Sequence, residues 1–109
     1  MRQTTKIMAT ILFGLLVAPV LTMAQVWLIS PTDGTTDLAS PVILQWSGSG
    51  INWYALQVDD DPDFSSPFLE QYDLYSNNKL VIGLEQNTTY YWRVDGYIVP
   101  MLWVGWTEP

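Results

Sequence analysis

The sequence contains no cysteine and no histidine, and these two absences exclude several kinds of chemistry. Without cysteine, no disulfide can brace the chain and no thiolate can serve as a nucleophile or metal ligand. Without histidine, the chain lacks the most common general base, the most common imidazole ligand and any histidine-based catalytic triad. No other catalytic motif is present. We therefore expect a protein that is not an enzyme and that uses no cofactor.

Positively charged residues are also few, because four Lys and Arg stand against eleven Asp and Glu, and the formal net charge is −7. A protein with this excess of negative charge is repelled by nucleic acid and by anionic membrane surfaces. The charge balance therefore predicts no nucleic-acid partner, and it favours solubility outside the cell.

The first 24 residues have the organisation of a secretory signal peptide. They begin with the cations Arg2 and Lys6, continue with a short apolar run over residues 7–21, and end with small residues up to a predicted cut after Ala24. A membrane anchor is the alternative, but the run is short for a bilayer span and contains a proline. Cleavage of residues 1–24 would leave 109 − 24 = 85 residues with a formal charge of 2 − 11 = −9. This pattern predicts a secreted or cell-surface protein without stable membrane insertion.

The rest of the chain has no long segment with apolar residues at helical spacing, and short alternating segments are found instead. Turn-forming residues separate these segments, for example the proline, aspartate and glycine within residues 31–37. The segments that predict strands are residues 26–30, 42–46, 53–59, 68–76, 79–84 and 90–99. Six short strands with turn signals between them predict an antiparallel β-sandwich with a single core.

The alternation within these segments also predicts which side chains face the core, because neighbouring residues of a strand point to opposite faces. The predicted core consists of Val42, Leu44, Trp46, Tyr54, Leu56, Val58, Leu80, Ile82, Leu84, Tyr90, Trp92 and Val94. The intervening side chains, such as Gln57, Asp59 and Arg93, are expected on the outer faces of the sheets.

The stretch LEQNTTYYWRV, residues 84–94, resembles the region around the sixth strand of a fibronectin type III domain of the kind found in exported bacterial proteins. That family carries a leucine, a threonine and a tyrosine at fixed spacing, and Leu84, Thr88 and Tyr90 match them. The resemblance implies an immunoglobulin-like sandwich over residues 25–109. It also implies that Tyr90 forms a tyrosine corner, in which the ring packs inward and the hydroxyl bonds to upstream backbone.

Further segments match the same family in the same order: SPTDG at residues 30–34, VILQW at 42–46, WYALQV at 53–58, DPDF at 61–64 and GWTEP at 105–109. The resemblance implies that Phe64 folds back as a lid on the core and that Trp106 covers one end of the core. One departure is that the family has a seventh strand after the GWTEP segment, paired with the sixth, whereas this sequence stops there.

Three explanations of the missing seventh strand remain open. The one that we favour is that the chain is part of a longer product, whose continuation supplies the strand. Alternatively, the segment MLWVGW, residues 101–106, folds back after Pro100 as a substitute strand. In the third explanation another chain donates a strand, because unpaired sheet edges invite such pairing.

The resemblance implies a non-catalytic spacer, or an adhesion or protein-interaction domain, with a protein or glycan partner that the residues do not specify. The strongest candidates for an interaction surface are the aromatic residues Tyr91, Tyr97, Trp103 and Trp106. Aromatic rings on a flat sheet can stack on sugars, so a carbohydrate-binding module is the alternative function. The structural explanation is that Trp106 covers the core and Tyr91 packs against a neighbouring strand.

The densest charge in the sequence is the group Asp59, Asp60, Asp61 and Asp63. Several carboxylates in one loop can bind calcium weakly, but the group lacks the ligand spacing, glycine and closing glutamate of an EF-hand. We therefore expect a solvated acidic loop, with a cation site as the alternative.

The triplet Asn87–Thr89 fits an N-glycosylation acceptor. The same residues supply the turn and the threonine that the resemblance requires before Tyr90. A structural role therefore accounts for the triplet without glycosylation.

Overall fold

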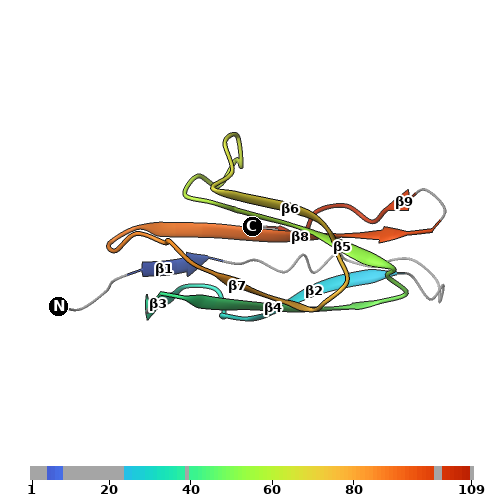
Figure 1. Ribbon diagram of the computed structural model, residues 1–109, viewed down its shortest axis with the longest axis horizontal. Helices are drawn as coiled ribbons and strands as arrows, with labels where there is room; N and C mark the ends of the chain where they lie inside the picture. The colour runs from blue at the N-terminus through green and yellow to red at the C-terminus, as the bar shows by residue number, and fades with distance from the viewer. Residues whose placement is uncertain (1–4, 9–23, 39, 100–101, 109) are drawn as a thin grey trace.

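The computed structural model describes residues 5–8, 24–38, 40–99 and 102–108. Within these ranges every regular element is a β-strand, which confirms the predicted all-β class (Figure 1). The strands are β1 (Thr5–Met8), β2 (Gln25–Ser30), β3 (Thr35–Leu38), β4 (Val42–Ser49), β5 (Trp53–Asp59), β6 (Leu69–Leu74), β7 (Asn78–Val81), β8 (Thr89–Ile98) and β9 (Leu102–Trp103). Residues 9–23, which include most of the apolar run of the predicted signal peptide, lie outside the described residues, as do Pro100 and Met101.

The strands form two sheets that face each other across one apolar core (Figure 1). The smaller sheet has the strand order β2–β4–β7 and is antiparallel throughout. The larger sheet has the order β3–β1–β8–β5–β6, with β9 also paired to β8. This sheet is mixed, because β1 runs parallel to β8. The two-layer arrangement is consistent with the predicted sandwich.

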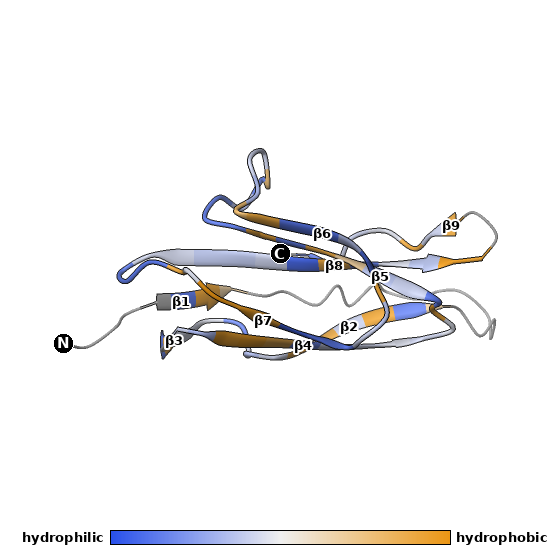
Figure 2. Ribbon diagram, in the orientation of Figure 1, coloured by the Kyte–Doolittle hydropathy of each residue, from blue (hydrophilic) through white to orange (hydrophobic). Residues whose placement is uncertain are grey.

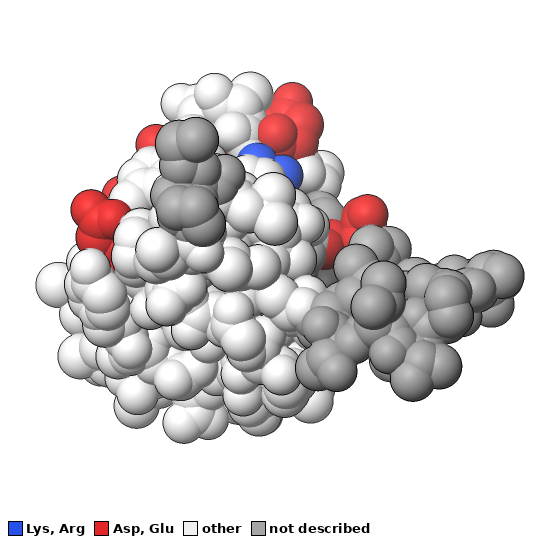
Figure 3. All heavy atoms as spheres, turned by 90° about the vertical axis from the view of Figure 1, so that its right-hand side faces the viewer, with Lys and Arg blue, Asp and Glu red and all other residues white. Residues whose placement is uncertain are grey.

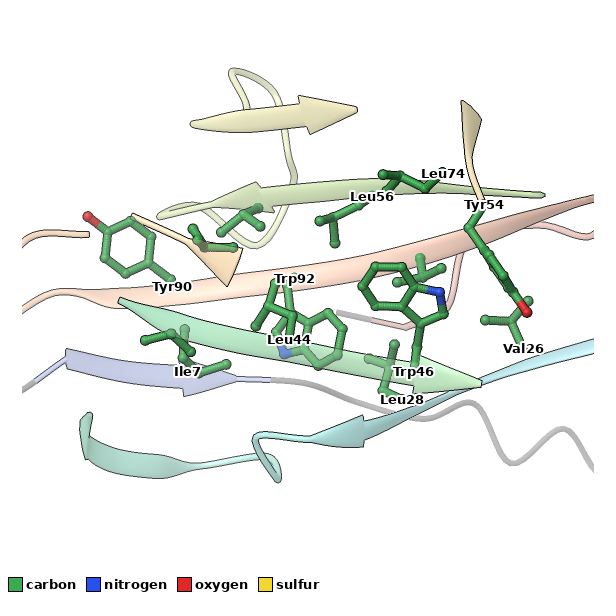
Figure 4. Close-up of a cluster of buried hydrophobic side chains, with 14 of the residues drawn as sticks. Ile7, Val26, Leu28, Leu44, Trp46, Tyr54, Leu56, Leu74, Tyr90 and Trp92 are labelled. Carbon is green, nitrogen blue, oxygen red and sulfur yellow. The ribbon is translucent and has the colours of Figure 1, made fainter. Parts of the chain in front are cut away.

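Strand β4 shows how the core is built from alternating residues. Val42, Leu44 and Trp46 are 5%, 1% and 1% exposed, whereas Ile43 between them is 53% exposed. Trp46 meets the ring of Tyr54 from the opposite sheet edge-on, with ring centroids 5.9 Å apart (Figure 4). Burying a side chain of this size contributes roughly 1.5–3 kcal/mol relative to leaving it exposed. The core residues predicted on β4 are therefore confirmed.

Strand β7 faces the other way from the prediction. Leu80 and Ile82, which were assigned to the core, are 51% and 68% exposed, and Val81 is buried instead. The ladder with β4 gives the physical reason, because Val81 lies opposite Val42 and Leu80 lies opposite Ile43. Residues directly opposite each other in a ladder share one face of the sheet. The prediction for Leu80 and Ile82 was therefore wrong by one residue.

The outer face of the larger sheet is covered. Gln57, Asp59 and Asp95 alternate with core residues as predicted, but they are only 7%, 1% and 6% exposed. The rings of Phe64 and Trp106 lie over this face, where both contact the outward-facing Arg93, and Phe64 is buried. Phe64 is not part of the apolar cluster between the sheets. The lid that the resemblance implied for the core therefore lies on the outer face of the sheet.

The chain enters β8 through the geometry of a tyrosine corner. The backbone N–H of Glu85 donates to the Tyr90 hydroxyl at 2.9 Å, and the Tyr90 ring is buried. Leu84 is buried just before the corner, and the Thr88 hydroxyl donates to the Gln86 carbonyl at 3.0 Å. Asn87 is exposed in this turn and adopts a left-handed backbone with φ 56. The residues that fit a glycosylation acceptor thus form the turn itself.

After β8 the chain turns back and pairs with the same strand. Beyond β9, the Val104 N–H donates to the Gly96 carbonyl at 2.8 Å, and the Thr107 N–H donates to the Val94 carbonyl at 3.0 Å. The Thr107 hydroxyl oxygen also accepts the Val94 N–H at 3.0 Å. We call residues 102–108 the C-terminal tail. Part of the MLWVGW segment thus folds back onto β8 as β9, as the second explanation expects, and the tail covers the C-terminal half of the β8 edge.

Strand β1 holds the N-terminal half of the same β8 edge, although the sequence predicts that its residues belong to a signal peptide. Residues 6–8 lie opposite Thr89–Tyr91 in parallel register, and β3 pairs with β1 on its other side. Ile7 is 0% exposed and lies in the core cluster, where Figure 4 shows it among the side chains of both sheets. Four residues of the predicted leader are therefore part of the fold in this structure.

Candidate interaction surface

Five aromatic side chains on the larger sheet form an unbroken chain of ring contacts: Trp53, Tyr72, Tyr75, Tyr97 and Trp103, which we call the aromatic band. Trp53 and Tyr97 are stacked, with ring centroids 4.4 Å apart and an interplanar angle of 15°. Trp103 meets Tyr97 edge-on at 4.9 Å and Tyr72 at 6.2 Å. Tyr75 adjoins Trp53 at 6.0 Å. The band therefore spans four strands, β5, β6, β8 and β9, together with Tyr75 just after β6.

The strand ladders bring the central three rings together. Trp53 lies opposite Tyr97 in the β5–β8 ladder, and Tyr97 lies opposite Trp103 in the β8–β9 ladder. Aromatic cross-strand pairs of this kind stabilise a sheet by roughly 0.2–1 kcal/mol each. The rings are not fully covered, since Trp103 is 39% exposed and Tyr72 is 48% exposed. The band combines a fixed geometry with ring surface that a partner can reach.

Aliphatic side chains near β9 are exposed as well. Val99 and Leu102 are both more than half exposed, and Val104 is 38% exposed. Figure 2 shows the apolar character of β9 and the chain beside it in orange. The end of the molecule nearest β9 presents mainly uncharged surface, with a few acidic groups and little blue (Figure 3). Exposed apolar surface gathered at one place, as in the aromatic band, marks interaction sites on soluble proteins.

A polar network lies beside the band on the same face. The guanidinium carbon of Arg93 lies 4.2 Å from the ring centroid of Phe64 and 4.7 Å from that of Trp106. Such cation–π contacts contribute about 0.5–1 kcal/mol at exposed sites. Arg93 Nε donates to Gln57 Oε1 at 2.7 Å, and Gln57 Nε2 donates to Glu70 Oε2. Burial lowers the pKa of Arg93, while the nearby carboxylates oppose this effect.

Asp95 ties the C-terminal tail to β8. Its Oδ1 accepts the backbone N–H groups of Gly96 and Gly105, each at 2.8 Å. Burial raises the pKa of Asp95, and these two hydrogen bonds together with Arg93 partly offset the rise. Gly105 has a left-handed backbone with φ 110, which L-residues with a side chain rarely adopt. The sharp turn of the tail therefore depends on Gly105 and presents its N–H to Asp95.

Tyr72 links the aromatic band to the polar network. Its ring contacts Trp103, and burial together with the neighbouring Glu70 carboxylate raises the pKa of its hydroxyl. The Tyr72 hydroxyl therefore stays protonated at neutral pH. Tyr72 and Glu70 provide a hydrogen-bond donor and an acceptor at the rim of the apolar surface.

The structure brings together only two of the four aromatic residues that the sequence singled out. Tyr97 and Trp103 belong to the band, whereas Trp106 packs on Arg93 and Tyr91 lies opposite Asp59 at the other end of the β5–β8 ladder. Trp106 therefore covers the outer face of the sheet rather than the core. Trp53, Tyr72 and Tyr75 were not among the predicted residues. Trp53 could have been predicted, because alternation along the predicted strand 53–59 points its side chain away from the core.

The acidic loop uses its carboxylates within the loop. Asp59 Oδ1 accepts the Asp60 N–H at 2.8 Å, and Asp61 Oδ1 accepts the Asp63 N–H at 3.1 Å. Asp63 Oδ1 accepts the Ser65 N–H at 2.9 Å, and the hydrogen bonds to Ser65 lower the pKa of Asp63. Among the described residues, no group of three or more acidic side chains is placed to hold a metal ion. The geometry is that of a turn stabilised by aspartates.

Comparison with models of protein families, with curated proteins and with solved structures found no match to this chain. In the part of the chain that the structure describes, no helix has the length and apolar character needed to cross a membrane. The interaction surface is therefore interpreted from its own residues and their geometry.

Proposed function

We propose that the protein is a non-catalytic interaction module of an exported, secreted or cell-surface protein, folded as a fibronectin type III-like sandwich. The signal-peptide pattern of residues 1–24 supports export. The hydrogen bond between Glu85 and Tyr90 and the two-layer strand order support the resemblance. The observation that carries the proposed function is the aromatic band, because it exposes ring surface that the fold itself leaves uncovered.

The aromatic band consists of residue types that are common in binding surfaces. Tyrosine and tryptophan are enriched among the residues that contribute most to binding, because each combines a large apolar area with a polar group. Trp53 and Tyr97 are held by their mutual stacking and by the β5–β8 ladder, so a partner that contacts them loses little side-chain entropy on binding. A rigid, exposed aromatic surface thus favours recognition over a purely spacing role.

A binding survey with matched variants tests this proposal. The full chain is labelled and applied to one array of immobilised peptides and one of immobilised polysaccharides. Retained ligands should bind Trp103→Ala and Tyr97→Ala at least about tenfold more weakly, which corresponds to about 1.4 kcal/mol. Ile43→Ala is the control, because Ile43 is also an exposed apolar residue but lies on the smaller sheet. Equal binding by all three variants would contradict a role of the band, provided that circular dichroism shows them folded.

A carbohydrate is the second candidate ligand, and the rim of the band favours it. Aromatic rings offer apolar faces on which sugar rings can stack, and the Tyr72 hydroxyl and Glu70 carboxylate next to them offer hydrogen-bonding partners for sugar hydroxyls. A neutral polysaccharide fits better than an anionic one, because the chain carries eleven carboxylates and few cations.

Tryptophan fluorescence distinguishes this second candidate. Titration of the full chain with neutral polysaccharides should change the emission of Trp53 and Trp103, and the change should be lost in Trp103→Ala but kept in Trp106→Phe. Absence of any change across a broad panel would remove the carbohydrate function. It would leave the wider proposal standing if the peptide array retains the protein.

A further inference from the structure

Strand β1 fills a position in the larger sheet that needs a strand. Its Lys6 N–H donates to the Thr88 carbonyl at 3.1 Å, and its Ile7 carbonyl accepts the Gly34 N–H at 3.1 Å. The Ile7 side chain is fully buried in the core cluster (Figure 4). β1 therefore satisfies backbone groups on both sides and also supplies a core side chain.

Export would remove this strand. The predicted cut after Ala24 lies beyond β1, so the mature chain would lose Ile7 together with the backbone partners of β3 and of Thr89–Tyr91. Among residues 102–108, the backbone hydrogen bond that reaches furthest toward the start of β8 is the one to Val94, so these residues do not occupy the position of β1. The first half of the β8 edge would then expose unpaired backbone groups beside an unfilled part of the core, which is the situation in which proteins accept an extra strand.

We propose that this edge of β8 is an acceptor site for an extended segment of another protein, with a β-branched aliphatic residue at the position of Ile7 and a basic residue beside it. The aliphatic residue follows from the full burial of Ile7 in the core cluster. The basic residue follows from charge, because the mature chain would carry 2 − 11 = −9 and the present occupant carries Lys6 next to Ile7. The site is distinct from the aromatic band, and it depends on the proposed export but not on what the band binds.

A peptide that copies residues 4–9 of the chain, TTKIMA, is the probe. In the full chain β1 competes with this peptide intramolecularly, so the wild type should bind it weakly. The variant Ile7→Asp places a charge in the core and should expel β1 without changing residues 25–109. Calorimetry should therefore detect binding of the peptide to Ile7→Asp, and the peptide should raise the melting temperature of that variant.

Two control peptides separate strand insertion from adhesion of any apolar peptide. Replacing the isoleucine of the probe by aspartate should weaken binding by a factor of about 100 or more, because a charge would enter the core. Replacing its lysine by glutamate should weaken binding by a smaller factor, and this factor should shrink as salt is added. A folded Ile7→Asp variant that binds none of the peptides, or binds all three alike, overturns the proposal.

A milder variant keeps the proposal testable if Ile7→Asp does not fold. In Ile7→Ala, hydrogen exchange of the Thr89–Tyr91 amides should slow when the TTKIMA peptide is added, and unchanged exchange counts against the site. Amino-terminal sequencing of the secreted protein should begin at Gln25. A secreted form that keeps residues 5–8 would overturn the proposal, because the site would be occupied by its own chain. Trp103→Ala should bind neither more nor less peptide in the Ile7→Asp background, which separates this site from the aromatic band.

Discussion

The two halves of the β8 edge are covered by different means. Along the C-terminal half, the tail is held by hydrogen bonds of Thr107 and Asp95 and by ring contacts of Trp103 and Trp106. Along the N-terminal half, β1 comes from the opposite end of the sequence and is held through its backbone and the buried Ile7. The difference teaches that one strand edge can be closed by segments from opposite ends of the sequence, of which, among the described residues, only β1 adds a side chain to the core cluster.

The largest expected effect is the loss of Ile7 in the full chain. Ile7→Ala should lower the free energy of unfolding by roughly 2–5 kcal/mol, because it deletes buried aliphatic groups and leaves a cavity. Urea unfolding followed by tryptophan fluorescence measures the change. Ile43→Ala on the exposed face of β4 is the control and should stay within about 0.5 kcal/mol of the wild type. A loss for Ile7→Ala no larger than that of the control would mean that β1 contributes nothing to the core.

The matching substitution in the C-terminal half of the β8 edge is Thr107→Val. Valine keeps the shape of threonine but removes the oxygen that accepts the buried Val94 N–H, so the variant should lose roughly 1–3 kcal/mol. Hydrogen exchange at the Val94 amide should accelerate at the same time. Thr107→Ser retains the hydroxyl and should protect that amide almost as well as the wild type. Equal exchange in the valine and serine variants would show that the side chain of Thr107 does not hold the tail.

Tyr90→Phe tests a polar contact within the N-terminal half of the β8 edge. Tyr90 lies opposite Ile7 in the sheet, and its hydroxyl accepts a hydrogen bond from the Glu85 N–H. The variant removes the acceptor of the Glu85 N–H and should cost about 1 kcal/mol, measured by urea unfolding. Tyr91→Phe, on the neighbouring residue of β8, leaves that hydrogen bond intact and should cost less. A larger loss for Tyr91→Phe would show that the corner does not stabilise the entry to β8.

The smallest expected effect is a pH dependence at Asp95. Burial raises the pKa of this carboxyl above its ordinary value of 3.8, so the folded chain binds more protons than the unfolded chain between the two pKa values. Its contribution to stability is therefore most favourable at low pH and becomes less favourable as the pH rises from 3.8 through the folded-state pKa. Asp95→Asn keeps an oxygen for the N–H groups of Gly96 and Gly105 but does not titrate.

Thermal unfolding of both proteins across acidic to neutral pH measures this effect. The stability of the wild type relative to Asp95→Asn should fall with rising pH and then level off once the folded carboxyl is ionised. The other carboxylates are common to both proteins, so their titration largely cancels in the difference. A difference that grows with pH would mean that hydrogen bonds from Gly96 and Gly105 outweigh burial at this carboxyl.

Much of the strand content was predictable from the sequence. The face of a strand is clear where polar and apolar residues alternate strictly. In β8, the polar Arg93 stands between the core residues Trp92 and Val94, and the structure agrees. In β7, Leu80, Val81 and Ile82 are all apolar, so alternation could not decide which of them faces the core. The ladder partner β4 decides this, and the identity of that partner is not written in the local pattern.

The interaction surface was predictable only in part. Tyr97 and Trp103 stood out as aromatic residues near the end of the sequence, but their contact requires that β9 fold back onto β8. Trp53 joins them because β5 pairs with β8 in one particular register. Tyr72 joins from β6, whose pairing with β5 contains an irregularity. Each of these contacts depends on the pairing of segments that are distant in the sequence.

The amino acids alone were sufficient for the all-β class and for the alternation of β4, β5 and β8 toward the core, because residue type and period-two spacing act within one strand. Three features arose only when the strands assembled: the facing of β7, the covered outer face of the larger sheet and the aromatic band. Strand order and register determine which side chains become neighbours, and a shift of one residue reverses the face on which each side chain lies. The contrast is clearest at Ile7, which reads as leader sequence along the chain and as a core residue in the folded sheet.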